Sequence, residues 1–426
     1  MIKHLVIVLL LLTAVTGRAQ TPKRALDSIT KVERDSIRKA EFLQNIGVGY
    51  FPTKYWNFDL RHLVKFNQFE GFRTGVGGIT NEAFSEKYRV NGYVVYGFKD
   101  KEVKYSIGGG VRLHEGSGTW LNATYTDDLQ ETGSSGFLTD KRFFTFFEPR
   151  LLNIDLFHRK ITKSLSLEHR ISNHLLSETE VAVSRINPTY NYNFDLNGEL
   201  FNTFALSTAT VSLQWSPFSQ FEMVDKRVDE VVDGFPKFTL QYTKGFADVF
   251  NADFNFGKVD FRTIHQFSLG EDSITNLTLV GGLAGGEIPL THLYHAYPNN
   301  INKDTILQRF SVAGLNSFET MYFNEFFSDR FMTFQFKHFL RPFNISDWFK
   351  PQLVLISRHA LGNMRSRDRH IGIPFETLEQ LYSESGFEIN KLIFGFGLSF
   401  AYRYGSYHLP VFEDNFAFKF TFNLSL

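Results

Sequence analysis

The last twelve residues of the chain, 415–426, alternate between apolar and polar side chains almost without interruption. The apolar positions share one parity and are Phe416, Phe418, Phe420, Phe422, Leu424 and Leu426. Alternation with a period of two predicts a β-strand whose two faces meet different surroundings. The run is about twice as long as a usual globular strand, and about nine to eleven residues are needed to cross a bilayer. The pattern therefore favours a membrane-spanning strand.

Two hairpins earlier in the chain repeat this alternation. Residues 88–113 carry apolar side chains on one parity on both sides of a turn predicted at Asp100 and Lys101. A second hairpin, predicted to turn near Asn390 and Lys391, has phenylalanines opposite glycine, serine and arginine. Lipid cannot satisfy the backbone groups of a sheet edge, so strands with such faces are expected to close into a barrel.

The predicted fold class is all-β: a transmembrane antiparallel β-barrel of about sixteen strands over residues 65–426. We expect the last strand to close the barrel by pairing with the first strand, near 69–80. Residues 20–64 are charged and rich in helix formers, which predicts a short periplasmic helical tether. The longer connections are expected to be extracellular loops or inward folds, at 133–159, 218–236, 287–305 and 362–380.

Composition supports a barrel rather than helical membrane spans. The chain holds 48 Phe, 17 Tyr and 4 Trp, yet beyond its start it has no run of about twenty apolar residues. Residues 1–19 have a basic start at Lys3, an apolar core and a small residue at Ala19, which predicts a cleaved secretory signal. Cleavage after Ala19 leaves 43 basic and 45 acidic residues, a balance that argues against nucleic acid as a partner. With no cysteine, the chain has no disulfide or thiol chemistry.

The densest polar cluster in the second half of the chain consists of Glu319, Asn324, Glu325, Asp329 and Arg330. One interpretation is an inward loop that occupies the lumen, because carboxylates and arginine pair favourably where water is restricted. The other is a solvated loop that enters a strand at the membrane interface.

Further residues are candidates for lining the lumen: Asp260, Arg262 and Arg403 lie on the polar parity of predicted strands. Glu70 and Arg73, in the first predicted strand, are additional candidates. Their parities are opposite, so a regular strand would direct at most one of them inward.

Enzymatic and metal chemistry are not expected. His292 and His295 are three residues apart, but no carboxylate or thiol flanks them at ligand spacing, so ordinary loop histidines are favoured. Serines such as Ser383 have His338 or His359 as conceivable bases, but no strained nucleophile turn accompanies them. We therefore expect a protein without catalytic, metal or cofactor sites.

Four stretches carry a family resemblance: KFNQFEGFRTGVG at 65–77, VYGFKDKEVKYSIGGGVRL at 95–113, FETMYFNEFFSDRFMTFQFKHFL at 318–340 and GFEINKLIFGFGLSFAYRYG at 386–405. Together they resemble the barrel part of an outer-membrane family of Bacteroidota, whose longer members carry an amino-terminal carboxypeptidase-regulatory-like domain. That barrel is similar, more distantly, to the sixteen-stranded BamA-like barrels that insert or translocate proteins. The loop before NSFETMYFNEFFSD stands where BamA-like barrels place an inward loop with an Arg-Gly-Tyr type motif, and that motif is absent here.

The resemblance implies an accessory role in envelope biogenesis, in the insertion or secretion of proteins or lipids. The alternative is an outer-membrane channel or transporter for small solutes, and a third class is an outer-membrane enzyme. The expected location is the outer membrane of a Gram-negative bacterium. The expected partners are outer-membrane lipid and lipopolysaccharide, together with periplasmic or outer-membrane assembly proteins.

Overall fold

The computed structural model describes residues 42, 45–134, 136–140, 150, 154, 156–224, 227–270, 272–301, 311–314, 316–346, 349–393 and 395–422. The chain divides into two compact units, 1–46 and 47–426. The described residues of the first unit, Phe42, Asn45 and Ile46, are helical. The signal sequence predicted over 1–19 lies outside the described residues. Everything that follows concerns the second unit.

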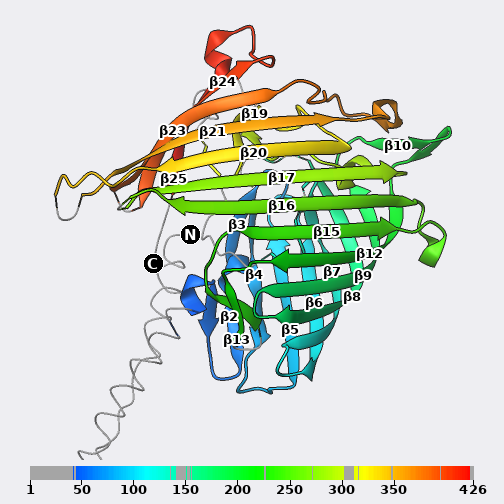
Figure 1. Cartoon of the computed structure of the whole chain (residues 1–426). Coiled ribbons are helices and arrows are strands. Elements are labelled where there is room, and N and C mark those ends of the chain that lie inside the picture. The colour runs from blue at the N-terminus through cyan, green and yellow to red at the C-terminus, as the bar shows by residue number, and fades with distance from the viewer. Residues whose placement is uncertain are drawn as a thin grey trace, which may run out of the picture. The chain divides into compact units, whose positions relative to one another are not determined.

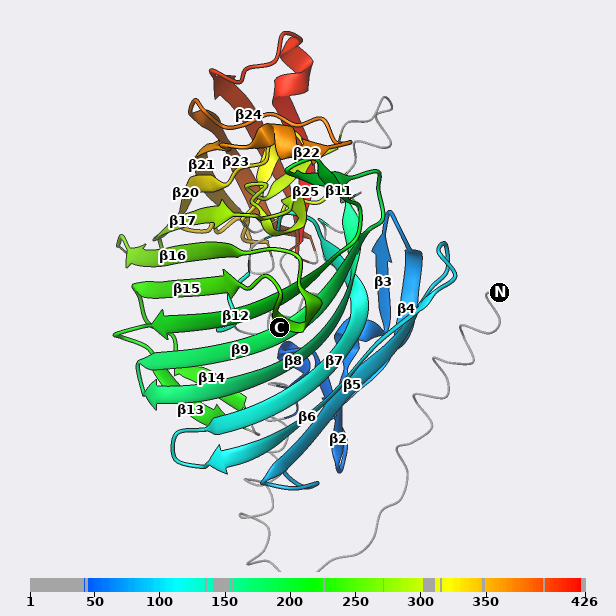
Figure 2. The same ribbon diagram turned by 90° about the vertical axis from the view of Figure 1, so that its right-hand side faces the viewer.

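The described residues of this unit form one curved wall, an 18-stranded sheet (Figures 1 and 2). It has sixteen antiparallel wall strands when β2 (Trp56–Asp59) and β3 (Val64–Asn67) are counted as one and the edge strand β1 (Tyr50–Pro52) is left aside. The first strand is composite, because β2 and β3 both pair with β4 and are separated by the 3-10 turn η1 (Leu60–His62). The others are β4 (Gly71–Thr80), β5 (Tyr88–Gly97), β6 (Val103–His114), β7 (Thr119–Glu131), β8 (Phe157–Ser172), β9 (Leu175–Pro188), β12 (Phe204–Trp215), β15 (Lys237–Gly245), β16 (Phe256–Ser268), β17 (Ile274–Gly286), β20 (Arg330–Phe339), β21 (Gln352–Asn363), β23 (Tyr382–Ile393), β24 (Phe396–Gly405) and β25 (Phe416–Phe422).

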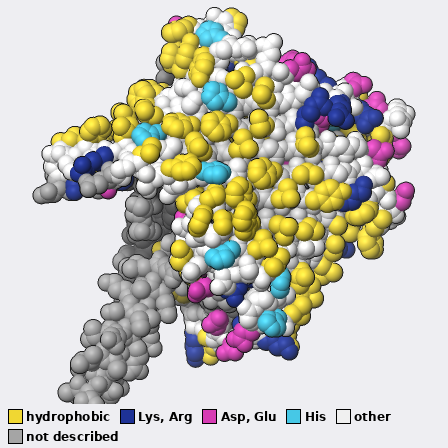
Figure 3. Space-filling model, viewed as in Figure 1, with side chains coloured by type: hydrophobic (Ala, Val, Ile, Leu, Met, Phe, Trp, Pro, Cys, Tyr) yellow, Lys and Arg dark blue, Asp and Glu magenta, His cyan; other side chains and the backbone are white. Residues whose placement is uncertain are grey.

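Side chains on the wall have the reverse of the usual polarity. On β6, Ile107 on the outer face is 62% exposed, whereas Lys104 on the inner face is 1% exposed. On β25, Phe418 is 44% exposed and Lys419 only 3% exposed. Hydrophobic side chains accordingly spread over the outer surface in Figure 3. An apolar outside and a polar inside are what a barrel in lipid requires, so the predicted transmembrane β-barrel of about sixteen strands is confirmed.

The two ends of the barrel differ. At the terminal end, where β2 begins and β25 ends, most connections are short turns. At the opposite end, here called the loop end, the small sheet β10 (Asn193–Leu196), β11 (Glu199–Phe201) and β22 (His370–Ile371) forms part of a cap. The Tyr192 hydroxyl is hydrogen-bonded to His370 Nδ1 (2.9 Å) and accepts from Leu290 N (2.9 Å), which ties the cap to the chain inside. Burial lowers the pKa of His370 to about 4, so this ring is neutral near pH 7.

The structure corrects several expectations about the connections. The segment 218–236 was expected as an extracellular or inward loop, but it contains the hairpin of β13 (Gln220–Val224) and β14 (Arg227–Val232) at the terminal end. β12 is the eighth strand of the wall, and after an even number of antiparallel strands the chain is again at the end of the barrel where β2 begins. The turn at Asp100 and Lys101 is present, with Lys101 at φ 58°. The second hairpin turns later than predicted, because β23 continues to Ile393.

The start of the wall also lies earlier than predicted. Tyr50–Pro52 (β1) and β2 are strands within the segment expected to be a helical tether, and the boundary placed between residues 64 and 65 falls inside β3. The interruption at η1 breaks the alternation, which hides this composite strand in the sequence. No helix within the described residues is long and apolar enough to cross a membrane.

Within the described residues, the predicted closing pair is not formed. The free side of β4 is occupied by β2 and β3, so β25 cannot pair there. Among the described residues, the ladder of β25 is with β24 alone, and none joins it to β2 or β3. The edge of β2 is covered by β1, which folds back on it as a hairpin. The boundary between β25 and the composite first strand is hereafter called the seam.

The polarity of the wall yields a test on two adjacent residues of β6. Ile107→Arg places a charge on the lipid-facing side and is expected to lower the free energy of unfolding by about 2 to 4 kcal/mol. Ser106→Arg enters the polar lumenal cavity that Ser106 lines, so it is expected to cost less than Ile107→Arg, although it breaks the hydrogen bond between Ser106 and Thr126 (2.8 Å). Urea titration of the protein folded into lipid vesicles measures both values. Equal costs at the two positions would mean that the faces are misassigned.

Candidate functional site

The connection between β17 and β20 folds into the barrel. This inward segment, residues 287–329, is described over 287–301, 311–314 and 316–329. It contains η4 (Leu290–His292) and a parallel pair of short strands, β18 (Pro298–Asn300) and β19 (Phe318–Tyr322). Phe318 and Met321 of β19 are fully buried, in a cluster with Phe331, Ala360 and Tyr382 of the wall. The inward segment therefore fills the lumen beside β20–β24.

A buried carboxylate on the wall binds the backbone of β19. Glu384 of β23 accepts hydrogen bonds from Glu319 N (2.9 Å), Thr320 N (2.9 Å) and Thr320 Oγ1 (2.6 Å). Arg358 of β21 completes its coordination, with Nη1 2.8 Å from Glu384 Oε1. Glu384 and Arg358 are almost completely inaccessible to solvent. A carboxylate of the wall thus accepts hydrogen bonds from two backbone N–H groups of β19.

Glu319 forms a second anchor, to the last strand of the barrel. Lys419 Nζ of β25 lies 2.9 Å from Glu319 Oε2, and it also donates to the carbonyl of Asn299. Ser317 Oγ donates to the same carboxylate at 2.7 Å. Burial opposes ionisation of Glu319, but the Lys419 ammonium and then the Arg358 guanidinium outweigh it and lower the pKa of Glu319. The carboxylate is therefore charged, and it ties the inward segment to β25.

Glu325 forms the third anchor. Its carboxylate accepts from both terminal nitrogens of Arg403 on β24, at 2.7 and 3.1 Å. The Arg403 guanidinium also lies over the Tyr382 ring, 4.8 Å from its centroid. Asn324, beside Glu325, adopts the left-handed conformation with φ 64°. Of the residues predicted from sequence, Glu319, Glu325 and Arg403 thus lie inside the barrel, where Glu325 pairs with Arg403 and Glu319 pairs with Lys419.

Asp329 and Arg330 do not join these anchors. Arg330 opens β20 on the same parity as the outward Met332, and its side chain is 37% exposed, so strand alternation directs it out of the lumen. Its nearest carboxylate oxygen, on Asp329, is 3.7 Å away. Asp329 instead accepts from Arg365 N at 2.9 Å, near the loop end. Arg330 therefore pairs with Asp329 at the start of β20, and the described contacts link it to neither Glu319 nor Glu325.

A second stretch, residues 136–140, also lies inside the barrel. Leu138 N donates to Gln241 Oε1 of β15 (2.9 Å), and Gln241 Nε2 donates to Gly136 O (3.0 Å). Arg262 of β16 pairs with Asp140 of this stretch. Asp260, also on β16, is buried on the same inward face. Both residues predicted to line the lumen from this strand therefore point inward.

Glu70 and Arg73 are both directed inward, which the sequence did not predict. Arg73 Nη1 lies 3.3 Å from Glu70 Oε2, and Arg73 also forms two bonds of 2.7 Å with Asp128 of β7. Alternation does not apply between the two residues, because Glu70 sits in the turn before β4 and Gly71 has φ 67°. The expectation that at most one faces the lumen was wrong for this reason.

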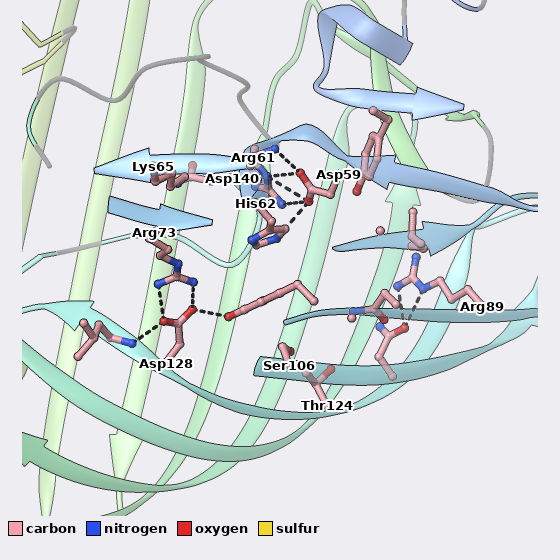
Figure 4. Close-up of a pocket in the computed structure, with 18 of the residues that line it drawn as sticks. Asp59, Arg61, His62, Lys65, Arg73, Arg89, Ser106, Thr124, Asp128 and Asp140 are labelled. Atoms are coloured by element: carbon pink, nitrogen blue, oxygen red, sulfur yellow. Dashed lines mark hydrogen bonds and ion pairs between the residues drawn. The ribbon is translucent and has the colours of Figure 1, made fainter. Parts of the chain in front are cut away.

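These residues border a polar cavity of about 820 Å³ on the inner side of β2–β8 (Figure 4). Most of its charged side chains have partners within the wall. Asp59 meets Arg61 at 2.9 Å and His62 at 3.5 Å, and Arg89 donates to Asn122 at 2.7 Å. The lumen is therefore occupied beside β20–β24 and hollow beside β2–β8.

The residues considered for metal or nucleophilic chemistry are separated or differently partnered. His295 Nε2 lies 2.7 Å from Glu131 Oε1, whereas His292 binds Thr291, and burial lowers the pKa of His292 well below its usual value. No group of three or more His, Cys, Asp or Glu that could hold a metal occurs in the described part of the chain. Ser383 Oγ lies 2.9 Å from His359 Nδ1, but the other nitrogen of that ring meets Ser357 rather than a carboxylate.

The fold and the occupied lumen define a transmembrane β-barrel with an anchored inward segment. Residues 49–340 match a domain described as the C-terminal domain of a family of unknown function, DUF5686, and the chain belongs to this family. No curated protein matches the chain by sequence.

Among solved structures, BamA from Haemophilus ducreyi lacking POTRA domains 1–3 is similar, with 9% identity and a TM-score of 0.52 over 95% of this chain and 79% of that chain. CdiB from Acinetobacter baumannii has 13% identity and a TM-score of 0.40, over 83% of this chain and 57% of that one. CdiB from Escherichia coli has 10% identity and a TM-score of 0.44, over 83% and 60%. The likeness to BamA confirms the expected BamA-like barrel at the level of the fold.

The Glu384 anchor is testable by substitution. Glu384→Ala leaves the Arg358 guanidinium buried and removes the acceptor of two β19 backbone N–H groups, so the free energy of unfolding should fall by about 3 kcal/mol. Glu376→Ala is the matched control, because it breaks an exposed pair with Arg367 and should cost below about 1 kcal/mol. Urea titration in detergent micelles compares the two variants. A Glu384→Ala protein as stable as the control would show that the inward segment is not held there.

Proposed function

We propose that this barrel is a non-enzymatic accessory in envelope biogenesis, which helps to insert or secrete proteins or lipids at the outer membrane. The proposal rests on the combination of a seam without a ladder and a lumen occupied by an anchored segment. A seam offers a sideways route between the lumen and the bilayer. Anchored side chains across the lumen disfavour a direct route through it.

The energetics of the two routes support this choice. Clearing the lumen beside β20–β24 means breaking the buried contacts of Glu384, Glu319 and Glu325, each of which leaves charges unpaired in a confined space. Opening the seam breaks no continuous ladder, because the described residues form none there. Passage along the seam is therefore the less costly of the two.

The proposed surroundings follow from the outer surface. An apolar outer face fits outer-membrane lipid and lipopolysaccharide, and periplasmic or outer-membrane assembly proteins are the proposed protein partners. Nucleic acid is not a proposed partner. The outer-membrane location is supported by the BamA-like fold, and export through a cleaved signal at 1–19 belongs to the same proposal.

A channel or transporter for small solutes is the second candidate, favoured by the cavity of about 820 Å³ beside β2–β8. Its lining of paired charges is wettable, and Asp140 of the inner stretch 136–140 reaches its border. A channel, however, needs a continuous water path from one end to the other. Steady, ion-selective conductance of the unmutated protein in planar bilayers would favour this candidate.

The proposed function predicts the result of depleting the protein in the bacterium that produces it. The amount of other folded, heat-modifiable outer-membrane barrels, or of surface lipopolysaccharide, should fall before growth stops. The expected decrease is several-fold and is restored by the unmutated chain. Quantitative proteomics of outer-membrane fractions measures it. An unchanged outer membrane, together with impaired uptake of a small solute, would contradict the biogenesis role and support the channel.

A further inference from the structure

The seam edge of β25 is partly occupied by the inward segment. Ala313 N donates to Phe420 O at 2.7 Å, and Phe420 N donates to Ser311 O at 3.1 Å. Val312 thereby forms a parallel bridge with Phe420. Residues 311–313, hereafter the edge cover, thus make the contacts that a neighbouring strand would make, although they belong to no strand of the wall.

The anchors of the inward segment also hold the edge cover. Asn299 Nδ2 donates to Val312 O (3.0 Å), and Lys419 of β25 donates to the Asn299 carbonyl. Glu319, the ion-pair partner of Lys419, accepts from Gly314 N directly after the edge cover (3.1 Å). The edge cover is therefore positioned against β25 by a defined set of polar contacts.

Within the described residues, the edge cover is shorter than the edge it protects. β25 runs from Phe416 to Phe422, and seam-facing backbone groups recur at every second residue. Of these groups, the described residues bind those of Phe420, whereas no ladder formed by described residues covers Phe418. Unpaired sheet edges are templates for another strand. A strand of seven or more residues could make several hydrogen bonds where the edge cover makes two.

The opposite edge of the seam is less available. β1 pairs with β2 in three successive positions, from Tyr50↔Asp59 to Pro52↔Asn57. Leu60 N also donates to Gly49 O at 2.9 Å. Because β1 is joined to β2 by a short turn, it is always close to that edge and competes well with any added strand.

We propose that the seam edge of β25 accepts an extended strand of a partner polypeptide, and that the edge cover is an autoinhibitory occupant which this strand displaces. This inference rests on the proposed function and specifies its partner class and its control. β25 has phenylalanines on its outer face and Ala417, Lys419 and Thr421 on its inner face. The fitting partner is therefore an outer-membrane strand that alternates apolar and polar residues.

Binding of a strand-forming peptide tests the proposal on the purified full-length protein in detergent micelles. The probe is a fluorescent peptide with the sequence NFAFKFTFNLSL of residues 415–426, a membrane strand of this chain, and a scrambled peptide without alternation is the control. Ala313→Pro removes the N–H that donates to Phe420, whereas Ala313→Ser retains it. The loss of one hydrogen bond from the competitor should tighten peptide binding about tenfold in Ala313→Pro and leave Ala313→Ser unchanged.

A disulfide lock keeps the test informative if Ala313→Pro folds poorly. The chain has no cysteine, so Val312→Cys with Phe420→Cys creates the only pair, at the bridged positions. Oxidation should abolish peptide binding, and reduction should restore it. With a single cysteine at Phe418→Cys, a cysteine-bearing peptide should form a mixed disulfide at the seam.

Two outcomes would overturn the inference: equal peptide binding by the oxidised and reduced lock, or binding that never yields the disulfide at position 418. These outcomes can be separated from a failure of the proposed function. If depletion reduces outer-membrane assembly while the peptide does not bind β25, the strand-acceptor inference fails and the biogenesis role stands. If the peptide binds at the seam but depletion leaves the outer membrane unchanged, the biogenesis role fails.

Discussion

The structure depends on the inability of lipid to form hydrogen bonds with the backbone. Away from its two edges, the N–H and C=O groups of the wall find their partners in neighbouring strands, and this requirement produces a single antiparallel sheet with apolar residues outside. The same requirement makes the two ends of the sheet its weakest places. Each is covered by a short piece of the same chain, β1 on β2 and residues 311–313 on β25.

The lumen follows a different rule, because polar side chains there can bind an inner segment. Glu384 holds the backbone of β19, while Lys419 and Arg403 hold the carboxylates of Glu319 and Glu325. Buried ion pairs contribute little net stability compared with apolar packing, but they are costly to break singly. They therefore fix where the inward segment sits. Since one anchor and the edge cover both involve β25, movement of the inward segment and access to the seam are coupled.

Alternation in the sequence was sufficient to predict the strands with strict parity, such as β6 and β25, the approximate strand number and the inside-out polarity. It failed where the backbone departs from regular extension. The turn η1 conceals the composite first strand, and Gly71 brings Glu70 and Arg73 to the same side. The polar cluster after the inward loop was recognisable, but its partners were not. Glu384 and Arg358 meet β19 only through the register of distant strands, which no local pattern encodes.

The most direct test of the open seam is amide hydrogen exchange along β25, measured by NMR in micelles. The N–H and C=O groups of Phe420 form hydrogen bonds on the seam side of β25, and every second residue of a strand directs these groups to the same side. The backbone groups of Phe418 therefore face the seam, whereas those of Lys419 face β24. An open seam predicts fast exchange at the Phe418 amide and strong protection at the Lys419 amide, because only the β24 side of β25 carries a ladder. Equal, strong protection at both amides would show a closed barrel and contradict an open seam.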